Sequence, residues 1–546
     1  MIDDFSYVKS AWDFATTHRL VYNGWATAMI GWQIAWGGLF AAIFGHTYSA
    51  VRAANFVTSF LTVWVMHAAI LRSGVSRRNA VAGTLAVALC PLFLPMSISF
   101  MTDISGLFSV VVCFYCCLRA LQSGTDRRVL VWLIAAGLLS TVGATARQIA
   151  WMSPLVMVPC AAWLLRRRRG VVPAAVVLWL VAASAMLASV RWFAHQPLSV
   201  PEGLVQGAIN AKSLRELLGN MTAALLCLLL ILLPLLAAWT RVRLSAVKVA
   251  LVVVAAAVLF FLFRVVTSHG MEKGIAPWTG DVLDKIGMMG YRNAWSLGVE
   301  PVPFSLPLRV ALSVLVLGVT VWFALAVRRT VPVATRTALP WRDLLVLTVP
   351  FLLAYFTLLA PRAMWGIVID RYLLLPVFFA VMFLLRLYAE RVSEHLPVRS
   401  LVLLAAFALF AVLGTHDWVA LHRARVSATA RLQGTGVSRT AIEAGYELDG
   451  MVQIQATGAV ADPRVSYPAG MDMAPWRPEG LTAGCREIFN DHTPVIRAVY
   501  FLSASPSEPS LRPGEAPCLV PSGVASQTYT AWMPPFHRQI FILRRP

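Results

Sequence analysis

The chain has 546 residues, of which 58% are hydrophobic and only 13% charged, and its mean hydropathy is +0.70. About a quarter of the residues in a soluble domain are charged, so this composition excludes an ordinary soluble protein. The formal net charge of +20 at pH 7 would suit a nucleic-acid-binding protein, but the positions of the arginines explain it differently.

The first fifty residues combine an acidic pair with interfacial aromatic residues. Asp3 and Asp4 begin the segment, and the four-residue spacing of Asp3 and Tyr7 puts both on one helix face. Tyrosine and tryptophan recur between residues 22 and 36, as is typical of membrane–water interfaces. We therefore expect residues 1–50 to form interfacial helices. An amphipathic anchor alone would explain the tryptophans but not the acids, which anionic lipid surfaces repel.

Long apolar stretches then recur through the chain. A hydrocarbon core of about 30 Å needs about 20 apolar residues in a helix, and backbone amides in hydrocarbon favour helices. The sequence predicts an all-α polytopic membrane bundle of about 12 spans within a membrane domain at 51–422. The expected spans are residues 51–71, 79–99, 104–121, 129–147, 149–165, 171–191, 217–239, 246–266, 306–327, 344–361, 371–389 and 400–420.

Arginines cluster between alternate spans, as the positive-inside rule expects of cytoplasmic loops. The basic charge thus follows from topology, and we expect membrane lipids as partners and no nucleic acid. The opposite connections, the acidic pair and the C-terminal part then lie outside the plasma (inner) membrane. Because no signal segment precedes Asp3, this orientation predicts a thirteenth span upstream. The clusters are Arg72, Arg77 and Arg78; Arg127 and Arg128; Arg166 to Arg169; Arg241 and Arg243; Arg328, Arg329, Arg336 and Arg342; Arg391 and Arg399.

The composition changes after residue 422. Residues 423–546 are rich in Pro, Gly and Ser and contain no spanning stretch, so we expect a small extracytoplasmic α+β domain. Alternating patterns at 450–455 and 539–543 predict strands. Cys485 and Cys518 lie in this domain and could pair in an oxidising compartment, which the sequence leaves open.

No cofactor motif stands out. Cys113, Cys116 and Cys117 lack a nearby histidine or acid, which favours helix packing over a metal site. We expect no cofactor, and nothing in the sequence supports a divalent metal. A phosphate-binding glycine loop, a zinc-protease motif and a nucleophile elbow are all missing from the sequence.

Charged residues gather at span ends on the expected extracytoplasmic side. Asp103, Arg147 and Asp370-Arg371 share this side with Asp3 and Asp4. Charges in such places are costly and usually mark a site. A carboxylate can act as a general base, and arginines bind phosphate bidentately.

These residues also have structural explanations. Asp103 could cap the helix that begins at Thr102, and Arg147 could extend to the lipid interface. Arg371 could form a local salt bridge with Asp370, and Arg362 is close enough to compete with Arg371 for a ligand.

Four short motifs occur in order on this side of the bundle: Asp3-Asp4-x-x-Tyr7; Leu39 to Gly45 followed by Arg52; Met101-Thr102-Asp103; and Asp370-Arg371-Tyr372-Leu373-Leu374-Leu375-Pro376. Together they resemble motifs of the GT-C membrane glycosyltransferases, which include protein O-mannosyltransferases, aminoarabinose transferases and bacterial core-sugar transferases.

The resemblance implies sugar transfer from a polyprenyl-phosphate donor to an acceptor at the extracytoplasmic face, by displacement with inversion. Asp3 would be the general base with Asp4 beside it, and Asp103 would orient the acceptor or the base. The donor phosphate would be bound by Arg147, Arg371 and Arg362. The sugar and the acceptor, whether glycan, lipid or protein, stay open.

One position departs from the family pattern. Many members carry Lys-Pro-Pro after the acidic pair, where the lysine meets the carrier phosphate. Here Met29-Ile30-Gly31 takes that place, and the nearest cation upstream is Arg19. Three explanations of the missing lysine stay open: another arginine contacts the phosphate, the donor differs, or the protein is inactive.

Two other classes of protein share this topology. A transporter or flippase for a lipid-linked or polar substrate would explain the buried charge, although the sequence shows no internal repeat. A non-catalytic assembly protein would also tolerate loss of the acids.

Overall fold

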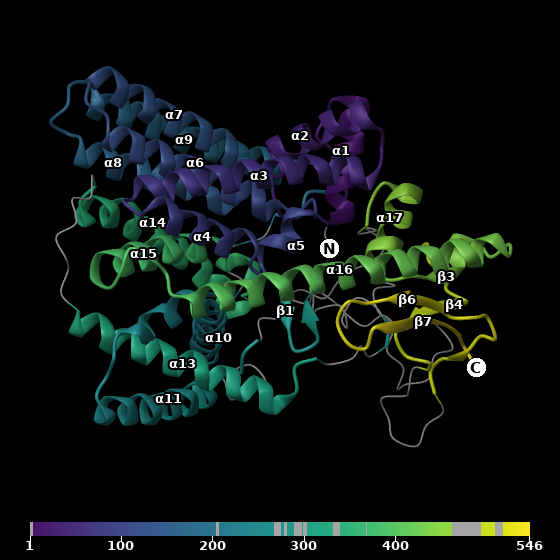
Figure 1. Cartoon of the computed structure of the whole chain (residues 1–546). Coiled ribbons are helices and arrows are strands. Elements are labelled where there is room, and N and C mark those ends of the chain that lie inside the picture. The colour runs from purple at the N-terminus through teal and green to yellow at the C-terminus, as the bar shows by residue number, and fades with distance from the viewer. Residues whose placement is uncertain are drawn as a thin grey trace.

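The computed structural model describes residues 4–201, 203, 207–266, 275–277, 281–288, 297–298, 303–330, 339–366, 368–460, 493–507 and 517–546. Most of them form a bundle of long apolar helices, with a small sheet at one end (Figure 1). By length and composition, ten of the described helical segments can cross a membrane. The chain is a multi-pass membrane protein, as its composition predicted.

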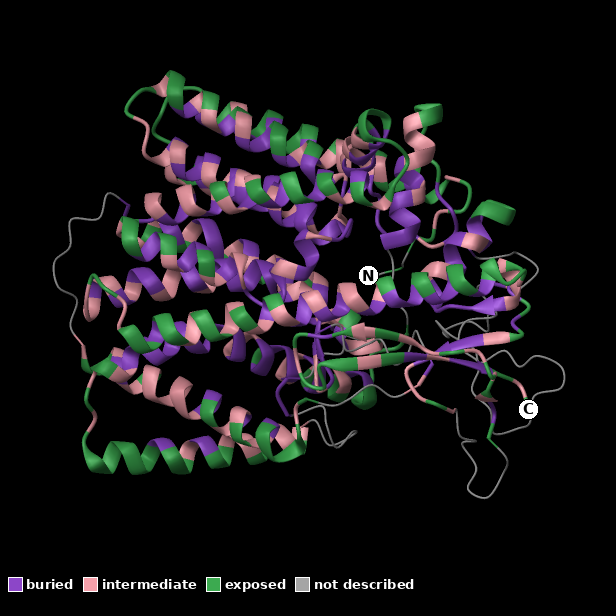
Figure 2. Cartoon of the chain, turned by 45° about the vertical axis from the view of Figure 1, so that its right-hand side comes forward, coloured by how far each residue is buried: buried purple, intermediate pink, exposed green. Residues whose placement is uncertain are grey.

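The bundle contains inner and outer helices. In the most apolar windows of α6 and α10, 72% of the residues are buried, against 11% in α11. The outer helices carry many exposed residues (Figure 2). Apolar ones such as Val253 and Phe261 of α11 are among them, as on lipid-facing helices. The helices of the bundle are α1 (Asp4–Thr17), α2 (Gly31–Phe44), α3 (Tyr48–Arg72), α4 (Arg77–Ala88), α5 (Phe93–Ser97), α6 (Thr102–Leu121), α7 (Asp126–Ala144), α8 (Val158–Leu164), α9 (Val171–Ala194), α10 (Ala211–Leu236), α11 (Ala246–Val266), α13 (Leu306–Arg329), α14 (Trp341–Trp365), α15 (Leu374–Arg391) and α16 (Val398–Gly434).

Two of the twelve expected spans are not continuous helices of spanning length. Residues 79–99 divide into α4 and α5, because Pro91 has no N–H and disfavours helical geometry in the residue before it. Residues 149–165 form a shorter segment, in which a 3₁₀ turn (Gln148–Trp151) and a π-helical turn (Ser153–Met157) lead into α8. The ten other expected spans each coincide with a described helix.

The arginine-rich connections meet at one end of the bundle. Arg72 Nη1 donates a hydrogen bond to the side-chain oxygen of Gln122 at 2.9 Å, and Ser76 Oγ donates to the carbonyl of Glu394 at 3.4 Å. These contacts join three connections that are far apart in sequence, as the alternation of arginine clusters predicted.

The N-terminal helices pack between the bundle and the C-terminal part. α1 packs against α2, which in turn packs against α3. The buried Phe5 side chain contacts the ring of Tyr446 edge to face, with centroids 5.5 Å apart. One face of α1 is therefore enclosed between two parts of the protein.

One helix connects the bundle to the C-terminal part. α16 has 37 residues and runs without interruption from the bundle to the sheet (Figure 1), so the boundary expected at residue 423 falls inside it. Leu421, Ala424 and Ala428 of α16 share a core with Leu502 and Ile542 of the sheet.

The C-terminal sheet has the strand order β3-β4-β7-β5, with β6 paired to β7. β3 and β4 are parallel, and the other pairs are antiparallel. A separate two-stranded hairpin, β1 (Leu283–Asp284) with β2 (Gly287–Met288), lies beside the bundle. The strands of the sheet are β3 (Ile442–Glu443), β4 (Tyr500–Ser503), β5 (Val520–Pro521), β6 (Gln527–Thr530) and β7 (His537–Arg544).

Of the two strands expected in this part, one is confirmed and one is wrong. Residues 539–543 lie in β7, but residues 450–455 lie in the helix α17 (Tyr446–Thr457). Tyr446, Gly450, Gln453 and Ile454 are buried, and their spacing is that of one helix face. The apparent alternation of Val452 and Ile454 with Gln453 and Gln455 did not reveal this period.

Candidate active site

Asp103 and Arg147 form a buried ion pair where α6 begins. The Asp103 carboxylate lies 2.5 Å from Arg147 Nη1, and the two side chains are 2% and 17% exposed. Arg147 Nη1 also lies 3.4 Å from the hydroxyl of Thr102. Arg147 thus points into the protein rather than out to the lipid interface, and Asp103 has a counter-ion as well as its place in the first turn of α6.

Arg371 extends this ion pair into a network. Its Nη1 lies 3.7 Å from the Asp103 carboxylate, and its Nε lies 3.1 Å from that of Asp281. The neighbouring Asp370 accepts hydrogen bonds from the backbone N–H groups of residues 282 and 283, at 3.0 and 2.6 Å. Asp370 thus fixes the start of the β1–β2 hairpin, which brings Asp281 to Arg371.

Tyr372 brings a third arginine to the same place. The guanidinium carbons of Arg147 and Arg362 lie 5.2 and 5.8 Å from the centre of its ring, within the range of a cation–π contact. The Tyr355 hydroxyl donates to the Tyr372 carbonyl at 2.6 Å, which holds the backbone of this residue. Arg362 and Arg371 therefore belong to one cluster and are not alternatives.

Three guanidinium groups meet in this cluster, those of Arg147, Arg362 and Arg371. The carboxylates of Asp103 and Asp281 pair with two of them, and that of Asp370 accepts backbone hydrogen bonds beside them. Three guanidinium groups offer planar donors that match phosphate oxygens. The arrangement suits the binding of an anionic group at the rim of the bundle.

Asp4 lies nearby in a different environment. Its Oδ2 accepts a hydrogen bond from Arg52 Nε at 2.8 Å, and its Oδ1 accepts one from the backbone N–H of Phe100 at 2.9 Å. Phe100 is three residues before Asp103, so the acids predicted at Asp4 and Asp103 do lie on the same rim. Asp3 lies outside the described residues.

The segment that replaces the family's Lys-Pro-Pro runs beside Arg147. The N–H groups of Ile30 and Gly31 donate to the carbonyls of Ala146 and Thr145, at 3.2 and 2.8 Å. A Cβ at residue 31 would lie 2.6 Å from Thr145 Oγ1, so only glycine allows this close approach. Residues 29–31 are thus held next to an arginine.

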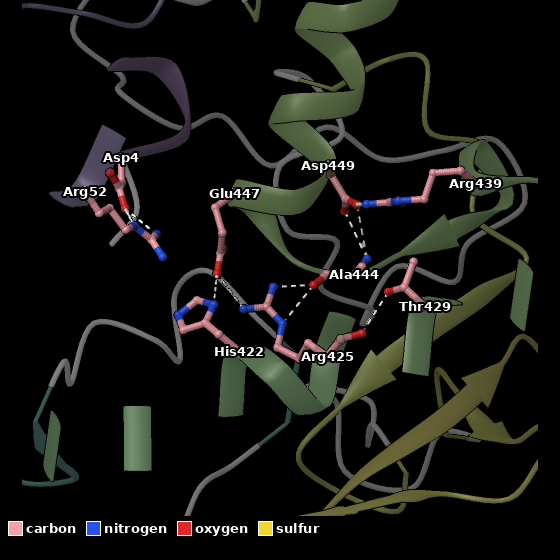
Figure 3. A network of polar contacts seen from close by, with 9 residues as sticks. All are labelled: Asp4, Arg52, His422, Arg425, Thr429, Arg439, Ala444, Glu447 and Asp449. Atoms are coloured by element: carbon pink, nitrogen blue, oxygen red, sulfur yellow. Dashed lines mark hydrogen bonds and ion pairs between the residues drawn. The ribbon is translucent and has the colours of Figure 1, made fainter. Parts of the chain in front are cut away.

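The sequence did not reveal a second buried ion network, between α16 and α17. Arg425 Nη1 lies 2.7 Å from the Glu447 carboxylate, and His422 Nδ1 lies 2.8 Å from it (Figure 3). Burial would raise the pKa of Glu447, but Arg425 and His422 outweigh it and hold this pKa well below the usual range. No local sequence motif predicts this network, because its residues come from separate helices.

Asp449 has the opposite pKa shift in the same region. Burial raises its pKa, although Arg439 and the N–H of Ala444 counteract part of this effect. Arg439 Nη2 lies 2.7 Å from the Asp449 carboxylate (Figure 3). Ion pairs thus fix α17 both to α16 and to the turn before β3.

In the described ranges, no three His, Cys, Asp or Glu side chains gather as metal ligands. Cys113, Cys116 and Cys117 are free thiols buried in α6. Cys518 forms a disulfide, whereas Cys485 lies outside the described residues.

The fold defines a multi-pass membrane protein, and three arginines gather with aspartates at one rim of its bundle. Residues 27–192 match the model of the dolichyl-phosphate-mannose-protein mannosyltransferase family. The resemblance to GT-C membrane glycosyltransferases, predicted from the short motifs, is confirmed by this match. No curated protein matches the chain in sequence.

Two solved structures share a weak overall likeness with the chain. ArnT from Cupriavidus metallidurans in the apo state is 12% identical with a TM-score of 0.33, covering 78% of this chain and 74% of that one. The same protein bound to undecaprenyl phosphate is 13% identical with a TM-score of 0.31, covering 78% and 76%.

Proposed function

We propose that this protein is an integral membrane glycosyltransferase that moves a sugar from a polyprenyl-phosphate donor to an acceptor at the extracytoplasmic face. The observation that carries the proposal is the meeting of Arg147, Arg362 and Arg371 around Tyr372 at one rim. The family match of residues 27–192 supports sugar transfer, because members of this family are described as using a lipid-phosphate sugar.

The arginines would stabilise the leaving group. The acceptor hydroxyl oxygen attacks the anomeric carbon of the sugar while the bond from this carbon to the phosphate oxygen breaks, which inverts the configuration. Negative charge then develops on the lipid phosphate, and preorganised cations lower the barrier where such charge develops. The proton of the hydroxyl passes to a carboxylate base.

The positions of the acids suggest different roles for them. Asp4 is engaged by Arg52 through one oxygen and by the Phe100 N–H through the other, so we assign it a positioning role. Asp103 orients Arg147 and Arg371. The base is then Asp3, next to Asp4 in the chain.

In this proposal, Arg147 binds the carrier phosphate in place of the missing lysine. The segment in the place of Lys-Pro-Pro is hydrogen-bonded to the two residues before Arg147. This closeness in the backbone supports a role for Arg147, from another element, in place of the lysine. This favours a phosphate-bearing donor over loss of activity.

The test is transfer of radiolabelled sugar from a panel of polyprenyl-phosphate sugars in membranes containing the full chain. Arg371→Lys and Arg147→Lys keep the charge but lose the planar fork, so we expect transfer to fall by about tenfold or more. Asp3→Asn should lower it by about a hundredfold, the range for loss of a general base.

Arg168→Lys is the matched control. Arg168 also pairs with an aspartate, Asp126 at 3.3 Å, but it is 43% exposed and lies in an arginine-rich connection at the other end of the bundle. Unchanged transfer in the site variants at equal expression would overturn the assignment. Absence of transfer from every donor would favour a transporter or a non-catalytic protein.

A further inference from the structure

The connection between β6 and β7 exposes a group of apolar side chains. Trp532 and Phe536 are 49% and 55% exposed, and Pro534 and Pro535 between them are also exposed. The backbone of this turn is closed by the Ala531 N–H, which donates to the Phe536 carbonyl at 2.7 Å. A well-formed turn thus presents aromatic side chains outward, which a water-facing turn does not require.

Contacts at both ends fix strand β6 along α16. The Asp417 carboxylate accepts hydrogen bonds from the N–H groups of Trp532 and Met533, at 2.6 and 3.0 Å. At the other end, Arg431 donates to the Ala525 carbonyl. The fourteen residues from Asp417 to Arg431 rise about 21 Å along a helix, and the seven from Ala525 to Trp532 extend about 23 Å along a strand. The two lengths agree, so the strand lies along α16, and its contacts with α16 set the position of the turn.

The turn lies where the apolar part of α16 ends. From Arg399 to Asp417 the helix carries no charged residue apart from these two ends, and it rises about 27 Å over this length. A hydrocarbon core is about 30 Å thick. Asp417, and with it the turn, therefore lies at one boundary of the membrane, and Ala525 lies about 20 Å further into water.

The turn also continues the lipid-facing surface of α16. Leu409 and Val412 are 60% and 41% exposed, and His416 follows them at the spacing of the same helix face. The ring of Trp532 stacks on that of His416, with centroids 3.7 Å apart and planes inclined by 5°. Trp532 therefore covers the next turn of the face that contacts lipid.

We propose that the β6–β7 turn is an interfacial anchor, in which Trp532 and Phe536 insert into the headgroup–acyl boundary of the leaflet on the side of the sheet. Aromatic side chains concentrate at this depth. Beyond the turn, the surface becomes polar and cationic, with the exposed Arg423 facing β6 at the depth of lipid headgroups. The occupant is thus the lipid surface itself, and the anchor fixes the height of the sheet above the bilayer.

The experiment is a depth measurement on the full chain in lipid nanodiscs. A nitroxide label is attached to Phe536→Cys, and its accessibility to oxygen is compared with that to a water-soluble nickel chelate. We expect the label to lie about 5–10 Å inside the lipid boundary. Ala525→Cys is the matched control, at the other end of the same strand, and its label should be fully accessible to the chelate.

Two further samples make the result decisive. His537→Cys keeps both aromatic side chains, and its label should be shielded from the chelate relative to that at residue 525. The unsubstituted chain gives the background signal; among its described residues six cysteines are free, and five of these are buried. Labels at 536 and 537 that are as accessible to the chelate as that at 525 would overturn the proposal.

Discussion

Asp4 and Phe100 are 96 residues apart in the chain, yet the carboxylate of one accepts a hydrogen bond from the backbone N–H of the other at 2.9 Å. The bond ties the first turn of α1 to the segment that leads into α6, three residues before Asp103. The start of α1 is thereby held beside the segment that leads to Asp103.

Replacing Asp4 should loosen this attachment. Asp4→Asn removes the counter-ion of Arg52, which is 34% exposed. Because solvent screens part of this ion pair, we expect the free energy of unfolding to fall by about 2 kcal/mol. The measurement is the apparent Tm of the purified protein, combined with proteolysis of the N-terminal segment. Asp13→Asn breaks a more exposed pair with Lys9 on the same helix and should cost well under about 1 kcal/mol. Equal effects of the two variants would contradict the structural role of Asp4.

Asp103→Asn should separate binding from catalysis. The substitution removes the negative charge that pairs with Arg147 and Arg371, so the donor phosphate meets a more positive site. We expect KM for the donor not to rise, while kcat falls by about tenfold or more because the arginines lose their orientation. Steady-state transfer with varied donor gives both constants. A raised KM with unchanged kcat would be inconsistent with a positioning role.

The Glu447 network predicts a pH dependence of stability. The pKa of Glu447 lies well below 4.5 in the folded protein. Ionised Glu447 therefore stabilises the fold at a pH above its pKa in the unfolded chain, and this contribution is lost as the pH falls through its pKa in the folded protein. Wild type should therefore exceed Glu447→Gln in Tm at pH 7, and the difference should shrink below about pH 4.5. Asp449, whose raised pKa acts in the opposite direction, is common to both proteins. A difference that stays constant down to pH 3 would refute this assignment.

Gly445 should tolerate no side chain. It has φ +94°, and a Cβ there would lie 1.5 Å from Nη2 of Arg425, so Gly445→Ala combines strain with a clash and should cost about 3 kcal/mol or more. Gly458 has φ +81° with nothing within 4 Å of a Cβ. Gly458→Ala should cost only about 1 kcal/mol. The difference between the two Tm values measures the contact with Arg425 together with the more strained backbone of Gly445, whose ψ is 158° against −9° at Gly458.

The membrane part was predictable because hydrophobic length is a local property. Each of ten expected spans coincides with a helix, and both failures occur at prolines. Pro91 divides one expected span, and Pro154 lies in the π-helical turn of the other. Window hydropathy does not register such breaks. The helix at 446–457 was missed because Tyr446, on its buried face, packs against Phe5, which is distant in sequence.

The site was predictable only in part. Arg147, Arg371 and Asp103 were found because charged residues at span ends are rare. The pairing of Arg371 with Asp281 was missed, since Asp281 sits among several charged residues in a long connection. Arg52 was noted as part of a motif, but its partner Asp4 was not evident, because the pair depends on how α1 packs against α3.

The unbroken course of α16 makes the bundle and the sheet one mechanical unit. A helix of 37 residues is about 55 Å long, so a tilt of about 5° within the bilayer displaces its far end by about 5 Å. The contacts of Asp417, Arg425 and Arg431 pass this displacement directly to the β6–β7 turn, to α17 and to the segment before β6. A bilayer of different thickness would therefore shift the sheet and α17 relative to the bundle, and under the proposed function lipid composition becomes a variable of sugar transfer.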